Sequence, residues 1–167
     1  MKFKLKKYFW DSFRFMDIFV DASVIPNVAS VGLIVVISDD LLEPIIVTTF
    51  PNIHQSTYAE VFTARAALEI ILKITNRSPI ITLYSDCKNL CTLMERRTNL
   101  ENRQFNNKRG RSLKYGDLYR HILVLIDSLV NIKKVKGHGK RTDEVGEIFS
   151  MVDRKCRKLL RTKNVTK

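Results

Sequence analysis

The sequence of 167 residues has no long hydrophobic run and few cysteines. No apolar stretch approaches the roughly 20 residues that a transmembrane helix needs, so we expect no spanning helix. Cys87, Cys91 and Cys156 form no Cys-x-x-Cys pair, and their odd number indicates a reducing compartment. We interpret Cys87 and Cys91 as packing residues. The basic start, residues 1–10, lacks the apolar core and cleavage site of a secretory signal.

Acidic residues are also in short supply. The 29 Lys and Arg residues outnumber the 17 Asp and Glu residues and give a formal net charge of +12, with a sequence pI near 9.8. This excess favours a polyanionic partner, nucleic acid first and an anionic membrane surface second, with a merely soluble basic protein as the alternative. The length and the hydrophobic fraction of 45% fit one domain with a core.

Short apolar segments rich in β-branched residues predict a sheet. Three of them follow one another with short links, which favours an antiparallel meander, and a fourth begins after Pro79. Ser56 or Thr57 offers an N-cap for the helix before that fourth strand, and this crossover makes the strand a parallel partner of the first. The predicted strands are residues 17–24, 30–38, 43–50, 80–85 and 132–135.

Apolar spacings of three and four predict helices between and after these strands. The stripe of the first helix is Glu60, Ala64, Ala67 and Ile71, and that of the last is Val145, Phe149, Val152, Cys156 and Leu159. Between them we expect one helix over about residues 86–97 and another containing Leu118, Ile122, Leu125 and Leu129. The basic segment 96–114 should protrude as a loop or short helix. The predicted order is β-β-β-α-β-α-α-β-α.

Four acidic residues lie where they can approach one another. Asp21 interrupts the first apolar strand, and Asp86 directly follows the fourth. Glu60 belongs to the first helix, in its first turn, and Asp153 borders the stripe of the last. Carboxylates are costly to place against a core without a partner, so acids at strand ends in a chain this basic indicate divalent cations.

Each acid also has an interpretation that involves no metal. Asp21 could be a turn-forming acid after a strand, and Glu60 a first-turn acid favoured by the helix dipole. Asp86 could be the N-cap of the next helix, a role that does not exclude metal binding. Asp153 could be a solvated partner of Arg157, four positions later.

Five motifs in this order resemble those of type 1 ribonuclease H, over about residues 16–161. They are Val20-Asp21-Ala22-Ser23, Ala59-Glu60 with the helix that follows, Leu83-Tyr84-Ser85-Asp86-Cys87, Lys136-Gly137-His138-Gly139 and Val152-Asp153-Arg154. Ala22 departs from the usual glycine and Cys87 from the usual serine. His138 and Asp153 are 15 positions apart, several more than usual. The insertion adds the rival acids Asp143, Glu144 and Glu147, and we keep Asp153 because its stripe continues to Leu160.

The resemblance implies an α/β RNase H-like fold. Its mixed five-stranded sheet would have an antiparallel meander of strands one to three, parallel strands four and five, and flanking helices. The domain would cover residues 16–161, between a basic N-terminal extension (1–15) and a basic C-terminal tail (162–167). The implied activity is that of a metal-dependent endonuclease that hydrolyses the RNA strand of RNA/DNA hybrids and leaves 3′-hydroxyl and 5′-phosphate ends.

The implied chemistry uses two Mg²⁺ ions, for which Mn²⁺ can substitute, roughly 3.5–4 Å apart at the two ends of an in-line displacement. Asp21 would bridge both ions. Glu60 and Asp86 would complete the site near the leaving oxygen, and Asp153 would hold the ion that activates water. His138 is a candidate for proton shuttling or product release, with a plain surface residue as the alternative.

The resemblance also implies contacts with the substrate. The residues concerned are Ser23, Ser56, Thr57, Lys88, Arg103, Lys108, Arg109, Arg111 and Lys114. The last five belong to the segment 96–114, which resembles the basic handle of some family members, with a solvated loop as the alternative. Two rival functions are a weak or inactive RNase H-like nucleic-acid-binding domain and a related nuclease acting on branched DNA. We expect an RNA/DNA hybrid as partner, no membrane, and a cytoplasmic or nucleoid-associated location, with viral, mobile-element or organellar origin left open.

Overall fold

The computed structural model describes residues 15–25, 29–38, 41–49, 55–75, 79–126, 130–136 and 143–164. The strands in these ranges are β1 (Phe15–Ile25), β2 (Ala29–Ser38), β3 (Leu41–Thr49), β4 (Ile80–Ser85) and β5 (Val130–Lys134). The helices are α1 (Ser56–Ile74), α2 (Lys88–Cys91), α3 (Arg97–Asn102), α4 (Gly116–Leu125) and α5 (Glu144–Asn164). Every predicted strand is present, with boundaries shifted by one or two residues at most.

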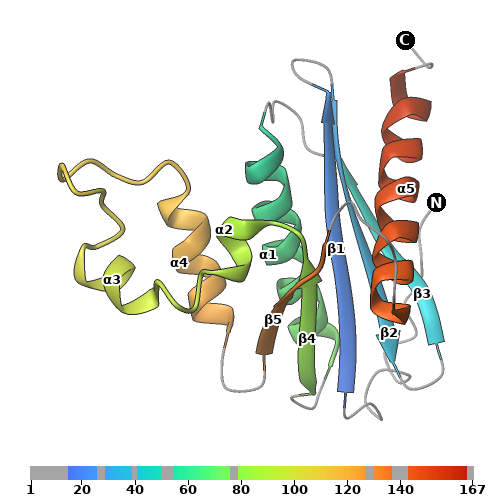
Figure 1. Cartoon of the computed structure of the whole chain (residues 1–167), viewed down its shortest axis with the longest axis horizontal. Coiled ribbons are helices and arrows are strands. Elements are labelled where there is room, and N and C mark those ends of the chain that lie inside the picture. Colours follow the sequence, from blue (N-terminus) through green and yellow to red (C-terminus); the bar gives the residue numbers. More distant parts are fainter. Residues whose placement is uncertain are drawn as a thin grey trace.

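The strands form one mixed sheet in the order β3-β2-β1-β4-β5 (Figure 1). β1 and β3 both pair antiparallel with β2, and β4 pairs parallel with β1 and with β5. The parallel pairing of β1 with β4 follows from the crossover through α1, because a helix between two strands returns the chain in its original direction. The predicted mixed five-stranded sheet is confirmed.

Both faces of the sheet are buried, which explains the nearly continuous apolar runs in its central strands. α1 and α4 cover one face and α5 covers the other (Figure 1). Successive residues of β1 alternate between these layers: Ile18 and Val20 pack on the α1 side, and Phe19 packs on the α5 side. Phe19 also stacks on Tyr84 of β4, with 4.7 Å between the ring centroids.

The two long helices bury the predicted stripes. Ala64 and Ala67 of α1 are fully buried, and so is Val152 of α5. The expected N-cap of α1 is wrong, because the cap residue is Gln55 and its side chain makes no capping hydrogen bond. Since α1 begins at Ser56, its first turn contains no acid, and Glu60 lies in the second turn. The helix dipole therefore does not account for Glu60.

The single helix predicted over residues 86–97 is wrong. α2 ends at Cys91, and a series of turns leads to α3 at Arg97. The Arg96 side chain donates hydrogen bonds to the carbonyl oxygens of Asn89 (2.6 Å) and Thr92 (3.2 Å). In a continuous helix the Asn89 carbonyl would accept from the amide of Leu93, which here donates to Leu90 instead (3.0 Å). The turns also bury both Leu90 and Leu93 completely, so tertiary packing replaces helix continuation here.

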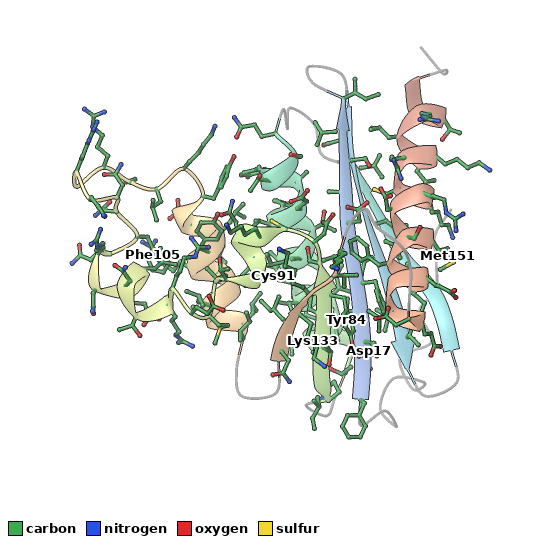
Figure 2. All side chains as sticks on the ribbon, viewed as in Figure 1. Asp17, Tyr84, Cys91, Phe105, Lys133 and Met151 are labelled. Carbon is green, nitrogen blue, oxygen red and sulfur yellow. The ribbon has the colours of Figure 1, made fainter. Side chains whose placement is uncertain are left out.

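The basic segment 96–114, called the handle from here on, protrudes from the domain beside α4 (Figure 1). It is a short helix followed by a folded loop. Phe105 anchors the loop: its ring is buried, its amide donates to the carbonyl of Leu100 (2.8 Å), and its carbonyl accepts from the amide of Leu113 (2.9 Å) (Figure 2). Phe105 has a positive φ of 60°, a strained conformation for an aromatic residue that these contacts compensate.

Candidate active site

Asp21 lies within β1, where it pairs with Leu33 of β2. β1 continues to Ile25, so the interpretation of Asp21 as a turn-forming acid after the strand is wrong. The residue is only 7% exposed, and among the described residues its Oδ2 has no hydrogen-bond partner. Burial raises the pKa of this carboxyl group to about 7, with further contributions from the charges of Asp86 and Asp153.

Asp86 is positioned next to Asp21 by the register of the two parallel strands. Phe15 pairs with Ile80 and Phe19 with Tyr84, so the same register continued along both chains brings Asp86 alongside Asp21. The ladder ends at Phe19 and Tyr84. The N-cap of α2 is Cys87, without a side-chain capping hydrogen bond, so the interpretation of Asp86 as that N-cap is wrong.

Glu60 approaches Asp21 and Asp86 from α1, which covers the face of the sheet opposite α5. Burial raises its pKa, and so does the nearby charge of Asp86. A hydrogen bond from the Cys87 thiol lowers the pKa, because a donor stabilises the carboxylate. This effect is smaller than that of burial and larger than that of the Asp86 charge. The same contact, together with burial as the larger cause, raises the pKa of Cys87 to about 12. Cys87, the residue directly after Asp86, is therefore bonded to the carboxylate of Glu60.

Asp153 enters from α5. Its Oδ2 accepts a hydrogen bond from Nη2 of Arg157 in an ion pair along the helix, as the interpretation without metal predicted. The Asp153 side chain is 16% exposed and that of Arg157 is 48% exposed. The charge of Asp153 nevertheless contributes to the raised pKa of Asp21, so the ion pair lies within the electrostatic reach of the buried carboxylate.

The four acids thus come together from β1, α1, α5 and the segment after β4. Carboxylate oxygens are the ligands that Mg²⁺ prefers, and a buried Oδ2 without a hydrogen-bond partner fits a cation ligand. Within the described ranges, however, no three His, Cys, Asp or Glu side chains are arranged to hold an ion as they stand. Protein groups already engage the side chains of Glu60, which accepts from Cys87, and of Asp153, which accepts from Arg157. The Ala22 amide also donates to the Asp21 carboxylate.

Thiols next to the acids are a feature that the sequence interpretation missed. Cys87, interpreted as a packing residue, is buried but also donates to Glu60. Cys156 is fully buried, with its sulfur 3.3 Å from the carbonyl oxygen of Val31 and 3.7 Å from that of Asp21. The position of Cys87 directly after Asp86 was the available signal, but the partner of its thiol depends on how α1 packs.

The predicted substrate-contacting residues form two groups. Ser23 lies two positions beyond Asp21 on β1 and is half-buried, and Lys88 is exposed at the start of α2. Five exposed cations belong to the handle: Arg103, Lys108, Arg109, Arg111 and Lys114. His138 lies outside the described residues, as do residues 1–14 of the predicted extension and 165–167 of the predicted tail.

Aromatic residues that the sequence interpretation did not single out connect the start of α1 to the end of the handle. The Tyr115 hydroxyl and the Gln55 side-chain oxygen form a hydrogen bond. The rings of Tyr58 and Tyr115 are 5.6 Å apart, and Nζ of Lys114 lies 5.8 Å from the centroid of the Tyr115 ring. Exposed Ser56 and half-buried Thr57, at the start of α1, are thereby placed on the side of the domain that carries the handle.

Comparison with solved structures decides the fold. The protease–reverse transcriptase of prototype foamy virus is similar over 89% of this chain and 21% of its own, with a TM-score of 0.70 and 15% identity. The PFV RNase H domain in solution is similar over 85% of this chain and 91% of its own, with a TM-score of 0.62 and 16% identity. The chain has the RNase H-like fold. It spans about a fifth of the protease–reverse transcriptase chain and nearly all of the isolated RNase H domain.

A solved type 1 RNase H gives the same result for the fold of this RNase H-like domain. LC9-RNase H1, described as a type 1 RNase H with the type 2 active-site motif, is similar over 84% of this chain and 70% of its own, with a TM-score of 0.66 and 12% identity. The sequence matches no protein-family model and no curated protein. In the described ranges, none of the helices is long and apolar enough to cross a membrane.

Proposed function

We propose that this RNase H-like domain is a metal-dependent endonuclease that hydrolyses the RNA strand of RNA/DNA hybrids. The observation that carries the proposal is the buried, unpartnered Oδ2 of Asp21 in a group of four carboxylates. Ionised carboxylates gathered in a buried site repel one another, so at a pH where they are ionised they favour bound cations. The fold similarity to RNase H domains supports the same chemistry.

The four acids would divide between two Mg²⁺ ions, with Mn²⁺ as a substitute. Asp21 would be a ligand of both ions, Glu60 and Asp86 ligands of one, and Asp153 a ligand of the other. When bound, the ions would lower the pKa of the attacking water and stabilise the charge on the leaving oxygen. The role of the protein is to hold the carboxylates in place through the strand register, α1 and α5. His138 remains a candidate for proton transfer or product release.

The proposed substrate rests on the handle. Its exposed cations Arg109 and Arg111 lie in a loop ordered by Asn107, whose Oδ1 accepts hydrogen bonds from both of their amides, at 2.8 and 3.1 Å. Duplexes with RNA character are recognised mainly through phosphates, shape and 2′-hydroxyl groups, so we propose contacts to the backbone with little sequence preference. A foamy viral protease–reverse transcriptase that is similar to this chain was solved with an RNA/DNA hybrid.

A specific observation also favours a second candidate, an RNase H-like domain that binds nucleic acid with weak or no catalysis. Glu60 and Asp153 already have protein partners, and the described side chains form no ready-made metal site. The two candidates make different demands on divalent cations, because binding through the handle needs none.

End-labelled RNA/DNA hybrid, incubated with Mg²⁺ or Mn²⁺, separates these candidates. We expect metal-dependent cleavage of the RNA strand that is lost in Asp86→Asn, with no cleavage of single-stranded or double-stranded RNA. A branched DNA junction in the same panel covers a related nuclease. Tight hybrid binding without cleavage would favour the binding domain, and preferential cutting of the junction would reassign the substrate.

The thiol beside Glu60 gives a further expected result. In Cys87→Ala the hydrogen bond to Glu60 is lost, whereas Cys87→Ser keeps a donor at this position. The thiol is a neutral donor that orients Glu60 without adding positive charge, unlike the guanidinium that pairs with Asp153. We therefore expect the alanine variant to bind Mn²⁺ about two- to fivefold more weakly, which corresponds to one modest hydrogen bond, and the serine variant to bind normally. Isothermal titration calorimetry measures both.

Cys91→Ala is the matched control for this experiment, because the Cys91 thiol donates to the carbonyl of Ser85 (3.3 Å) and not to a carboxylate. Equal Mn²⁺ affinity in the alanine and serine variants of Cys87 would show that the thiol only fills space.

A further inference from the structure

Arg157 occupies an unusual place for a surface arginine. It follows Asp153 by one turn of α5 and is paired with it, while its side chain stays 48% exposed. The carboxylate at the other end of the pair is mostly buried and contributes to the raised pKa of Asp21. The ion pair therefore has one end in solvent and the other in the candidate active site.

Such a pair adds little to stability, but it places a positive charge next to one of the four acids. Ion pairs four residues apart on an exposed helix face contribute little to stability. Among the described groups, those whose charges shift the pKa of Asp21 and Glu60 are all acidic. The guanidinium of Arg157 thus supplies positive charge to a cluster that otherwise consists of carboxylates.

We propose that Arg157 is an exchangeable counter-ion that pairs with Asp153 until the carboxylate becomes a metal ligand and then binds a phosphate of the substrate strand. The inference rests on the proposed function and deepens it, because it couples occupation of the metal site to the grip on the substrate. Asp153 Oδ2 accepts from Arg157 and cannot use the same lone pair for a cation, so the two partners compete.

The chemistry and position of Arg157 suit both of its partners. A guanidinium donates two parallel hydrogen bonds to a carboxylate or to a phosphate with similar geometry, and unlike an ammonium it stays charged and weakly hydrated. In the ion pair Arg157 uses Nη2. Arg161 is exposed one further turn along α5, on the side of Arg157 away from Asp153. A released Arg157 would therefore form, with Arg161, a cationic surface suited to a phosphate backbone.

Two binding measurements on Arg157→Ala test the exchange, with Lys155→Ala as the matched control. Lys155 is an exposed cation of the same helix, and its removal changes the net charge equally. Calorimetry with Mn²⁺ in the absence of nucleic acid should show roughly two- to fivefold tighter binding by Arg157→Ala, because the competitor is gone. Fluorescence anisotropy of a labelled hybrid in Ca²⁺ should show about two- to fivefold weaker binding. Lys155→Ala should leave the Mn²⁺ affinity unchanged.

The opposite signs distinguish exchange from damage to the fold, which would weaken both interactions. Arg157→Lys should lie between wild type and alanine in both measurements. Unchanged or weaker Mn²⁺ binding by Arg157→Ala, or no Mn²⁺ binding by either protein, would overturn the inference. Arg157 would then only stabilise α5 through its ion pair. Failure of the proposed function alone would look different, because Arg157→Ala would still show both opposite shifts while wild type bound Mn²⁺ and hybrid without cleaving the hybrid.

Discussion

Asp21→Asn is expected to reduce hybrid cleavage by a factor on the order of 10³ or more while making the metal-free protein more stable. The loss of activity follows because the proposed ligand shared by both ions becomes neutral. The gain in stability follows because the substitution removes a buried negative charge: Asp21 is 7% exposed, and its Oδ2 has no hydrogen-bond partner among the described residues. Cleavage assays and thermal unfolding in EDTA measure the two effects.

The stability effect should depend on pH in a defined direction. Burial and the neighbouring acids raise the pKa of Asp21 from 3.8 to about 7 in the folded protein. The protonated form is therefore favoured by folding, and this contribution is complete below pH 3.8 and disappears as the pH rises through 7. The difference between the two pKa values corresponds to roughly 4 kcal/mol for the full titration. We expect the asparagine variant to gain on wild type steadily between pH 4 and 8, and saturating Mg²⁺ to reduce the gap.

Asp17→Asn is the matched control for this variant. Asp17 lies four positions earlier on β1, near Tyr84 and Lys133 (Figure 2). Burial raises its pKa too, but a hydrogen bond with the Thr82 side chain and the charge of Lys133 oppose that rise. Cleavage by Asp17→Asn should stay within about twofold of wild type, because Asp17 is outside the group of four acids. Equal activity of wild type and Asp21→Asn would remove Asp21 from the site.

Charge reversal at Arg109 and Arg111 is expected to weaken hybrid binding by one to two orders of magnitude at low salt. Each phosphate contact contributes a slope of about 0.9 to the dependence of log K on log salt, so losing two contacts should lower the slope by roughly 2. Both residues are exposed, and the handle protrudes well away from β1 and α5 (Figure 1). Turnover at saturating hybrid should therefore change little while KM rises.

Lys73→Glu combined with Lys155→Glu provides the control for the handle. These exposed residues lie at the end of α1 and on α5, and reversing them changes the net charge by the same amount without touching the handle. A general electrostatic effect would weaken binding equally in both double variants. Unchanged hybrid affinity of the Arg109 and Arg111 variant at low salt would reduce the handle to a solvated loop.

Local sequence was sufficient to predict the sheet and the two long helices. The strand over residues 80–85 lies between Pro79 and Asp86, and its predicted limits are those of β4. α1 and α5 follow from stripes whose members are buried on opposite faces of the sheet. The break between α2 and α3 could not be predicted in this way, because it depends on the Arg96 side chain binding two backbone carbonyls and on tertiary burial of leucines.

The candidate site was predictable in its members but not in their partners. Spacing along α5 identified Arg157 as a possible partner of Asp153, because residues four apart share a helix face. No comparable rule connects Glu60 to the Cys87 thiol, since α1 and the turn after β4 meet only in the folded domain. The same holds for the Tyr115–Gln55 hydrogen bond, which joins residues 60 positions apart.

The four acids of the candidate site are held by two separate hydrophobic cores, one on each face of the sheet. Glu60 is held by the layer that contains α1, and Asp153 by the layer in which Phe149, Val152 and Cys156 of α5 pack on the sheet. A fragment without α5 would keep three of the four acids, and α5 alone would keep one. If the proposed cleavage is the function, activity would return only when the two pieces associate. This architecture would then lend itself to a split enzyme whose cleavage of a nucleic acid reports the meeting of two fused proteins.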